Sequence, residues 1–406
     1  MILYDIESIN HVNARPKITV IGIGGAGGNM INAIIKEGIN HINFIALNTD
    51  FQALSNVNVE EKIVLGSSLT GGMGTGANPE IGKMAIEENI DLVLEKISDS
   101  DIVFLLAGLG GGTGSGVVPL LAKILQEKQI LSIALVTKPF FFEGSRRMQV
   151  AQQAISKIEE YIDTLIIIPN QKLFESNSAQ DISLCDAFDK INALMVDSIK
   201  AVTDTIFSPG HINVDFADIK TTMSKMGRAV IGIGKGSGEK RAIDAIQKAI
   251  ASPLLENNSL KGARSILLNI HGDDSLSLQE MNIIAGFVHD EAHPEAHIIV
   301  GSSINKHKED DSITLTIIAT GFEDQLKTRI QNKNNIHLHN QVQMHYQSVQ
   351  KQNFYNQQPI QGSQANQGFF QSNHSDKGID GSQKQVVDFS KNIDIPTYLR
   401  NQHIEK

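Results

Sequence analysis

Apolar and polar positions in the first half of this chain follow two alternating patterns. Five short runs, rich in β-branched residues, predict buried strands over 18–23, 42–47, 102–107, 131–137 and 165–168. Between these runs, apolar residues recur at helical spacing, for example over 29–37, 80–88, 117–127 and 146–161. Buried strands that alternate with helices are typical of a parallel sheet covered on both faces. A ligand of such a sheet binds in the loops at the carboxyl ends of its strands.

The second half of the chain shows three further patterns. A long helical pattern over 184–206 ends at Ser208, Pro209 and Gly210 and predicts one central helix. Beyond it, the predicted strands (229–233, 265–270, 296–300, 313–318) outnumber the predicted helices (240–250, 278–289), which favours a smaller α/β domain with a mixed sheet. From 332 to 384 the chain is rich in Gln, Asn, Ser and Gly, and this composition predicts a disordered linker.

These patterns predict six parts along the chain. They are an N-terminal extension (1–16), a first α/β domain (17–183), a central helix with its following loop (184–226), a second α/β domain (227–321), a linker (322–388) and a tail peptide (389–406). The tail contains a compact apolar cluster over 394–400. A cluster of that kind after a linker is typical of a peptide that docks in a groove of a partner.

Composition excludes several classes of protein. The chain has 406 residues, 41% of them hydrophobic, and a formal net charge of −10, which argues against a protein that coats nucleic acid. Its single cysteine, Cys185, cannot form an intrachain disulfide, which suits a reducing cytoplasm, and we expect it to be a small core residue. No apolar run approaches the ~18 residues of a membrane span, and residues 1–13 lack signal-peptide features. We therefore expect no direct insertion into a membrane.

Three glycine-rich loops are the strongest chemical signal. Five glycines fall within Gly110–Gly116, between a predicted strand and a predicted helix, and Gly22–Gly28 has the same setting. A third run, from Thr70 to Pro79, again leads into a helix. Glycine loops bring backbone N–H groups close to a ligand, and at a helix N-terminus that ligand is usually an anion. We expect the loops to converge on one edge of the sheet and to suit a di- or triphosphate, with the Thr113 and Ser115 hydroxyls as further donors.

The Gly22–Gly28 run has an alternative interpretation. It satisfies the dinucleotide fingerprint G-x-G-x-x-G, with Asp50 where a ribose-binding acid would lie. Taken alone, it indicates an oxidoreductase that uses nicotinamide or flavin, but that function leaves the other two loops without a role. A P-loop is excluded because the chain has no G-x-x-x-x-G-K-[ST] pattern.

Two other patterns are interpreted as structural. The run Gly232–Gly238 is predicted to be a flexible turn of the second domain. No metal ligand is predicted, because Pro294 interrupts the helical spacing of His289, His293 and His297.

The run Gly110–Gly116 also matches the tubulin signature GGGTG[ST]G. With five other segments, it makes the chain resemble the tubulin/FtsZ family of GTPases from about 17 to 321. The segments are GGAGGN (24–29), NTD (48–50), GANPE (76–80), KPF (138–140) and NVDFAD (213–218). The resemblance implies a tubulin-like α/β fold with a Rossmann-like parallel-sheet GTP-binding domain, a long central helix and a smaller α/β domain. It also implies a cell-division GTPase that forms head-to-tail filaments and binds GTP or GDP with Mg²⁺, and it leaves a role for K⁺ open.

The resemblance assigns nucleotide-binding residues. On the loops these are Gly24, Gly25, Ala26, Gly27, Gly28, Asn29, Gly76, Ala77, Gly111, Gly112, Thr113 and Gly114, and beside them Glu143, Arg147, Asn170, Phe188 and Asn192. Phe188 and Asn192 are four residues apart on one helix, hence on one face, which suits stacking a purine and contacting its edge. Without the resemblance, Phe188 would be interpreted as a core residue beside a polar neighbour. The segment 143–147 would then be interpreted as a helix cap with solvated basic residues.

The resemblance also assigns catalytic residues, namely Asn213, Asp215 and Asp218 in the loop after the central helix. Two carboxylates three residues apart near a helix start can bind a cation or orient a water molecule. They can equally cap the next helix, and the sequence leaves both interpretations open. In the family this loop completes the site of the next subunit. An alternative function, a filament protein that binds GTP without useful hydrolysis, is disfavoured by these two aspartates.

Partners and location follow from the same resemblance. It implies a homopolymer with head-to-tail contacts. No nucleic acid is expected as a partner, because the net charge of −10 argues against one. The tail peptide is implied to bind membrane-adaptor division proteins through Asp394, Ile395, Pro396, Tyr398, Leu399 and Arg400. The expected location is the cytoplasm, at the division site on the inner face of the cell membrane.

Overall fold

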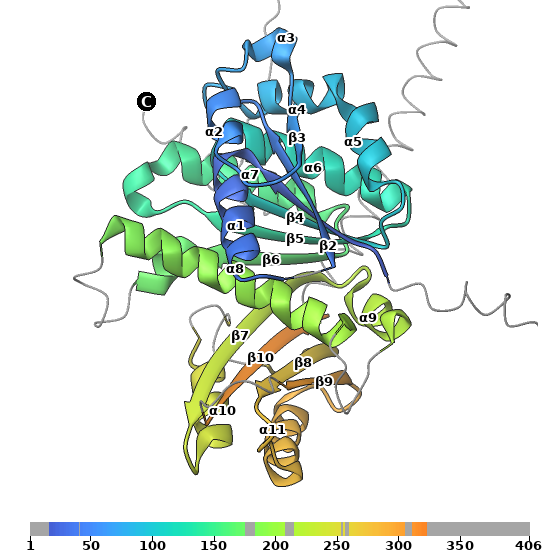
Figure 1. Ribbon diagram of the computed structural model, residues 1–406, viewed down its shortest axis with the longest axis vertical. Coiled ribbons are helices and arrows are strands. Elements are labelled where there is room, and N and C mark those ends of the chain that lie inside the picture. Colours follow the sequence, from blue (N-terminus) through green and yellow to red (C-terminus); the bar gives the residue numbers. More distant parts are fainter. Residues whose placement is uncertain are drawn as a thin grey trace, which may run out of the picture. The chain divides into compact units, whose positions relative to one another are not determined.

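The computed structural model describes residues 16–39, 41–174, 183–207, 215–252, 255, 260–304 and 311–322. These residues form one ten-stranded sheet with helices on both faces (Figure 1). The strands are β1 (Ile18–Ile23), β2 (Ile42–Asn48), β3 (Glu61–Val64), β4 (Ile102–Gly108), β5 (Leu131–Lys138), β6 (Thr164–Pro169), β7 (Gly227–Ser237), β8 (Ser265–Gly272), β9 (His297–Ile304) and β10 (Ser312–Thr320).

The helices follow in the same chain order. The α-helices are α1 (Gly24–Lys36), α2 (Phe51–Ser55), α3 (Ser67–Thr70), α4 (Pro79–Glu88), α5 (Ile90–Ile97), α6 (Gly112–Glu127), α7 (Ser145–Glu159), α8 (Leu184–Phe207), α9 (Phe216–Met223), α10 (Arg241–Ile250) and α11 (Leu278–Glu291). Two short 3₁₀ helices, η2 (Phe141–Glu143) and η3 (Asn170–Phe174), follow β5 and β6.

The first part of the sheet is parallel, in the order β3-β2-β1-β4-β5-β6. The five predicted strands are confirmed, each to within about one residue at either end. Strand β3, which forms the sheet edge and has only four residues, was not predicted. Because all of these strands run the same way, the loops after β1, β2 and β4 lie at the same edge of the sheet.

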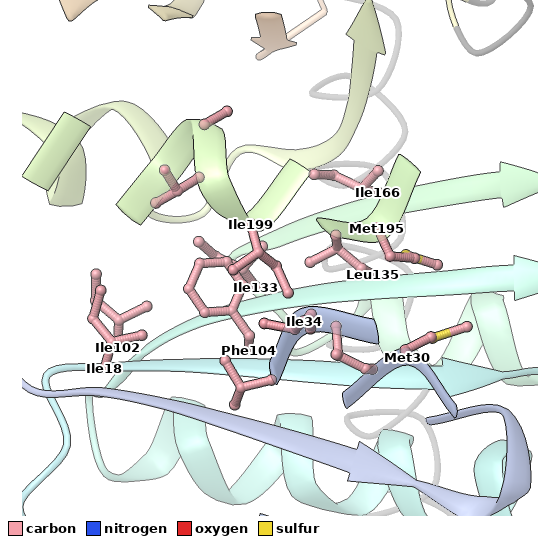
Figure 2. Close-up of a cluster of buried hydrophobic side chains, with 14 of the residues drawn as sticks. Ile18, Met30, Ile34, Ile102, Phe104, Ile133, Leu135, Ile166, Met195 and Ile199 are labelled. Atoms are coloured by element: carbon pink, nitrogen blue, oxygen red, sulfur yellow. The ribbon is translucent and has the colours of Figure 1, made fainter. Parts of the chain in front are cut away.

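Helices bury both faces of the parallel strands. On one face, Met30 and Ile34 of α1 and Met195 and Ile199 of α8 share a buried apolar cluster with Phe104 of β4 (Figure 2). On the other face, α4, α5, α6 and α7 cover a second apolar cluster. At about 25 cal/mol per Å² of apolar surface, this two-sided burial is the main term that holds the sheet.

The central helix α8 is confirmed over almost the predicted range. It has 24 residues, packs on α1 and also contacts β8, β9 and β10, so it lies between the two parts of the sheet (Figure 1). Near its start, Phe188 contacts Phe140 just after β5, with ring centroids 5.7 Å apart, and its last residue, Phe207, contacts His41 just before β2, with ring centroids 5.9 Å apart. The helix therefore runs from the carboxyl ends of the parallel strands to their amino ends.

The second part of the sheet is mixed, as predicted. β7 continues the parallel sheet beside the start of β6, β10 is antiparallel to both β7 and β8, and β8 and β9 are parallel. Helices α10 and α11 cover one face and share a cluster with residues such as Ile266 and Leu315. The sequence analysis did not predict that the two α/β parts share one continuous sheet.

The interpretation of Gly232–Gly238 as a flexible turn was wrong. Residues up to Ser237 belong to β7, and α10 packs against that strand. A Cβ added at Gly232, Gly234 or Gly236 would lie 2.6, 2.0 or 1.9 Å from a backbone oxygen of α10. Glycine at every second position therefore leaves one face of β7 flat enough for the helix backbone to lie directly on it.

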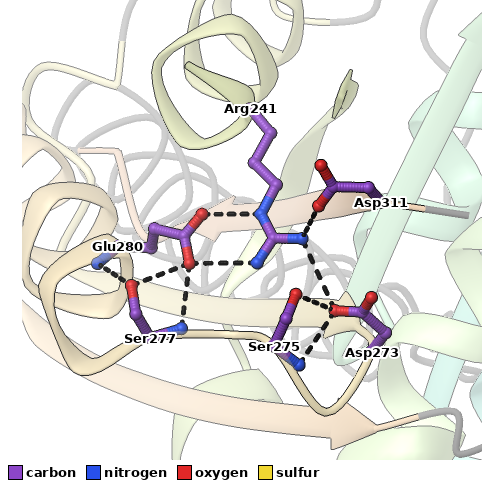
Figure 3. A network of polar contacts seen from close by, with 6 residues as sticks. All are labelled: Arg241, Asp273, Ser275, Ser277, Glu280 and Asp311. Carbon is purple, nitrogen blue, oxygen red and sulfur yellow. Dashed lines mark hydrogen bonds and ion pairs between the residues drawn. The ribbon is translucent and has the colours of Figure 1, made fainter. Parts of the chain in front are cut away.

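One buried arginine joins the elements at the start of α10. The Arg241 guanidinium is 4% exposed, and its Nε and Nη2 donate to the two oxygens of Glu280 over 2.6 and 3.1 Å (Figure 3). Nη1 donates to Asp311 over 2.5 Å and to Asp273 over 3.4 Å. Ser277, the N-cap of α11, forms a capping box with the same Glu280. The network ties the beginnings of α10, α11 and β10 together.

Several predicted parts lie outside the described residues. They are the N-terminal extension apart from Pro16, Asn213, the linker beyond Phe322 and the tail peptide with Asp394, Ile395, Pro396, Tyr398, Leu399 and Arg400. Within the described ranges, no helix has the length and apolar character that a membrane span needs.

Candidate nucleotide site

The three glycine loops meet at the carboxyl edge of the parallel strands. Gly24, at the start of α1, lies against Thr113, to which an added Cβ would come within 3.5 Å. The space beside Gly112 is filled by Thr75 and Asn78 of the third loop. The hydroxyls of Thr49 and Thr113 are hydrogen-bonded over 2.8 Å. The three glycine loops therefore converge on one edge of the sheet, as expected.

Two helices begin at this meeting point without a side-chain cap. The N-cap residues of α1 and α6 are Ile23 and Gly111, and neither makes a side-chain cap hydrogen bond. By contrast, Asp50 caps α2 and Asn78 caps α4. The first N–H groups of an α-helix have no partner within the helix and carry the positive end of its dipole. Two such ends on one edge of a sheet form a ready site for an anion.

The loop glycines are of two kinds. At Gly27 and Gly114, an added Cβ would lie 2.5 Å from a backbone oxygen, so these glycines permit close packing of the loops on the sheet. At Gly25, Gly76 and Gly111, no atom lies within 4 Å of an added Cβ. These three therefore border open space, which leaves room for a ligand to approach the backbone. Ala77, the residue after Gly76, has a φ of 62° and so lies in the left-handed region.

Two side chains near the loops have structural roles instead of the predicted binding roles. The Ser115 hydroxyl accepts a hydrogen bond from the Gly110 N–H over 2.9 Å and so braces the loop, and because the residue is 4% exposed it is shielded from a ligand. The Asp50 carboxylate accepts from the N–H of Ala53 as the cap of α2. Asp50 is thus occupied as a helix cap, which removes the acid that the dinucleotide interpretation needed.

A hollow of about 710 Å³ adjoins the loops. Asn29, which ends the first glycine run, lines it with Phe188 and Asn192 of α8, and the hollow continues along α1 to Lys36 and Glu37. The Phe188 side chain is 43% exposed, and its ring meets Phe140 edge to face with centroids 5.7 Å apart. Phe188 is therefore not a core residue, and its open face is available for stacking.

Two more predicted residues lie in the same region. Arg147 Nη1 donates to Glu143 over 2.5 Å, and Glu143 also accepts the N–H of Phe140. The backbone of Arg147 contacts Gly110 of the signature loop, which places this pair beside the loops. Asn170, at the end of β6, is 4% exposed, and its Oδ1 has no hydrogen-bond partner among the described residues. A buried acceptor without a partner is costly, and a ligand donor would satisfy it.

The prediction that Cys185 is a core residue was wrong. The thiol is exposed and lines the hollow, one helical turn before Phe188. The sequence pattern could not show this, because Cys185 lies in the first turn of α8, where the helix begins beside the hollow.

The two aspartates lie at the opposite end of the sheet. Asp215 and Asp218 begin α9, and the end of this helix is tied to the amino end of β6 by a 2.5 Å hydrogen bond from Thr164 Oγ1 to the Met223 carbonyl. Both carboxylates are exposed, and Asp215 makes no side-chain cap hydrogen bond. Neither enters an ion pair within the described ranges. Capping, the structural alternative for Asp215, is therefore excluded.

Comparison with known proteins agrees with the sequence resemblance. The family model "Tubulin/FtsZ family, GTPase domain" matches residues 17–178, and "FtsZ family, C-terminal domain" matches residues 227–323. A protein named "Cell division protein FtsZ" from Buchnera aphidicola is 39% identical over 394 residues, with 97% of this chain and 98% of that protein covered. Its namesake from Magnetospirillum gryphiswaldense is 43% identical over 77% of this chain, which spans only 55% of that longer protein.

Solved structures give the same result. An empty FtsZ dimer from M. jannaschii has a TM-score of 0.72 and 37% identity, covering 79% of this chain and 92% of that one. A GTPγS-bound CetZ2 protofilament from Haloferax volcanii has a TM-score of 0.63 at 20% identity, covering 79% of this chain and 98% of that one. At that identity the likeness concerns the fold alone.

Proposed function

This chain belongs to the tubulin/FtsZ family of GTPases, and from that premise we propose that it binds GTP where its three glycine loops meet and hydrolyses it only between successive subunits of a filament. The loops supply the binding half of the site. The aspartates of the next subunit supply the other half.

One observation carries this proposal: the loops and the aspartates lie at opposite ends of the sheet in one subunit. The helix that runs between them, α8, has 24 residues and is therefore about 36 Å long. Exposed Asp215 and Asp218 are thus far beyond hydrogen-bond reach of a nucleotide held on the loops of their own chain. A second copy, stacked head to tail, brings its aspartates to those loops. A contact of this kind that does not close on itself generates an open filament.

In this arrangement the residues divide the work. The uncapped starts of α1 and α6 hold the phosphates through backbone N–H groups, with Thr113 as a further donor. Phe188 stacks on the guanine, while Asn192 and the unpartnered Oδ1 of Asn170 contact its edge. Asp218 of the next subunit, with Asp215, orients the attacking water and accepts its proton. A positioned base of this type typically contributes a factor of 10² to 10⁴ in rate.

A Mg²⁺ ion fits this site as a partner of the phosphates. Among the described residues no three His, Cys, Asp or Glu side chains gather to hold a metal, so the ion would take most of its oxygen ligands from the nucleotide and water. Such an ion supplies charge neutralisation for the transferred phosphoryl group. Turnover measured in buffers with K⁺ or Na⁺ tests whether a monovalent cation also contributes.

The tail peptide would act outside the enzyme. Its apolar cluster, Ile395, Pro396, Tyr398 and Leu399 between Asp394 and Arg400, suits docking to a membrane-anchored adaptor. The filament would then lie in the cytoplasm on the inner face of the membrane at the division site.

Mixing two inactive variants tests the shared site. Asp218→Ala keeps the loops intact, and Phe188→Ala keeps the aspartates intact. Asp218→Ala alone is expected to hydrolyse GTP about a hundredfold more slowly than wild type, or worse. Phe188→Ala alone is expected to turn over slowly at a GTP concentration near the wild-type KM, because it loses the stacking that holds the base. In a random one-to-one copolymer about one contact in four joins intact loops to intact aspartates, so the mixture should recover about a quarter of wild-type turnover.

The control replaces Phe188→Ala with the double variant Phe188→Ala/Asp218→Ala, which should give no recovery. Circular dichroism of each variant checks that the fold is kept. Turnover of the first mixture that merely equals the mean of its two components would mean that each subunit hydrolyses its own nucleotide, and the proposal would fail.

A further inference from the structure

Thr49 links the glycine loops from beneath. It follows β2, is fully buried, and its hydroxyl is hydrogen-bonded to the Thr113 hydroxyl over 2.8 Å. Its carbonyl accepts the N–H of Gly74, in the third loop, over 3.0 Å. One residue thus contacts both the signature loop and the third loop without itself facing solvent.

We propose that Thr49 is a positioning residue for phosphate binding: its hydroxyl donates to Thr113 and leaves the Thr113 proton free for an anionic oxygen. Nothing in the family comparison assigns this role. The inference rests on the proposed function, because it takes the ligand at these loops to be a phosphate group.

The direction of the hydrogen bond follows from what each hydroxyl can satisfy. A hydroxyl has one proton to donate and two lone pairs. Within the described residues, the Thr49 hydroxyl has Thr113 as its one hydrogen-bond partner. If Thr113 donated, the Thr49 proton would be buried without an acceptor, which is unfavourable. If Thr49 donates, its own proton is satisfied and the half-buried Thr113 keeps a free one.

A free proton on Thr113 matters because phosphate oxygens only accept hydrogen bonds. Thr113 is the second residue of α6, whose first N–H groups face the same anion site. A hydroxyl that already accepts a bond also donates more strongly, since hydrogen bonds in a chain polarise one another. Thr49 therefore gives the site a preset donor, so that little reorganisation is needed when the phosphate arrives.

The chain offers a matched control at the other end of the sheet. Thr19 of β1 is also fully buried, and its hydroxyl is hydrogen-bonded to the Ser100 hydroxyl over 2.7 Å. This pair has the same chemistry as Thr49 and Thr113 but lies near the amino ends of the strands, away from the loops. A purely structural role for such a pair would therefore give the same result at both places.

The experiment measures equilibrium binding of GDP and of guanosine to the full chain by calorimetry. GDP avoids hydrolysis, and guanosine lacks the phosphates. Thr49→Val keeps the shape and the carbonyl but removes the donor, and we expect it to weaken GDP binding about three- to tenfold, because the Thr113 hydroxyl loses the hydrogen bond that orients and polarises it. Guanosine binding should stay within about twofold, Thr49→Ser should restore GDP binding, and Thr19→Val should leave both ligands unchanged. Thr49→Ala, which also removes the hydroxyl, should give the same loss as Thr49→Val.

A double-mutant cycle with Thr113→Ala completes the test. If Thr49 acts through Thr113, Thr49→Val should cause no further loss of GDP affinity in that background. The inference is overturned if Thr49→Val binds GDP as wild type does, weakens guanosine equally, or acts additively with Thr113→Ala. Failure of the wild-type chain to bind GDP at all would instead overturn the proposed function.

Discussion

The half-buried carboxylate of Glu280 allows a quantitative test of the network around Arg241. Glu280 receives two hydrogen bonds from Arg241, and its Oε2 also accepts the N–H and hydroxyl of Ser277 over 2.9 and 2.8 Å. These contacts, with the hydrogen bonding from Arg241 as the largest cause, lower the pKa of Glu280 from 4.5 to about 2. The substitution Glu280→Gln removes the charge while keeping the size of the side chain.

The size of the effect follows from the pKa. A shift from 4.5 to about 2, at about 1.36 kcal/mol per unit, corresponds to about 3 kcal/mol of folding free energy. The Glu280 side chain is 19% exposed, and screening by solvent reduces this figure, so we expect Glu280→Gln to cost about 2 kcal/mol at pH 7. Because the folded pKa is the lower one, the contribution is complete above pH 4.5 and is lost as the pH falls towards 2.

Urea denaturation of the full chain, followed by circular dichroism, measures this effect. Glu280→Gln should have a lower urea midpoint than wild type, and the difference between the two midpoints should be the same at pH 7 and pH 5.5. At pH 4 this difference should be smaller. Asp290→Asn, at an exposed carboxylate of the same helix, should change stability by less than about 0.5 kcal/mol. Equal midpoints for Glu280→Gln and wild type at pH 7 would show that the network contributes nothing to stability. A difference that did not become smaller at pH 4 would refute the assignment to this carboxylate.

Two further predictions concern the second domain and the tail. Gly234→Ala places a Cβ 2.0 Å from the Ala245 carbonyl oxygen and should destabilise the fold by about 3 kcal/mol. Gly286→Ala, in an open position of α11, should instead stabilise the fold by about 0.5–1 kcal/mol. Thermal denaturation compares the two variants, and similar melting points would contradict the packing argument. Deletion of residues 394–406 should leave GTP turnover unchanged and abolish co-sedimentation with adaptor-bearing vesicles, so a loss of turnover would mean that the tail belongs to the enzyme.

Much of the fold could be predicted because apolar runs are strong signals. The strands β1, β4 and β5 and most of β6 are buried on both faces, and such strands appear as continuous apolar segments. The strand β3 could not be found in this way, because only Ile63 of its four residues is buried. The continuity of the sheet through β6 and β7 was equally hidden, since it depends on a pairing of only three residues, Thr164–Ile166 with Gly227–Ala229.

The site was predictable to the level of its loops but not of its individual hydrogen bonds. Glycine spacing showed where backbone N–H groups would gather, because that spacing has few other uses. It could not show that Ser115 turns inward to brace Gly110, or that Thr49 lies beneath Thr113. Thr49 and Thr113 are far apart in the chain, and the direction of the Ser115 side chain depends on the backbone conformation of its loop. The glycines of β7 were misinterpreted because their spacing alone does not show that the backbone of α10, the next helix, lies directly on them.

The separation of loops and aspartates along α8 has a consequence for a growing polymer. In a filament of the proposed kind, the last subunit at one tip presents loops that no neighbour covers, and its GTP stays intact however long it waits. At the other tip the aspartates have no nucleotide to act on. Each arriving subunit therefore allows hydrolysis to begin at the contact that it forms. The time since that contact formed, and not the age of either molecule, determines whether its GTP has been hydrolysed.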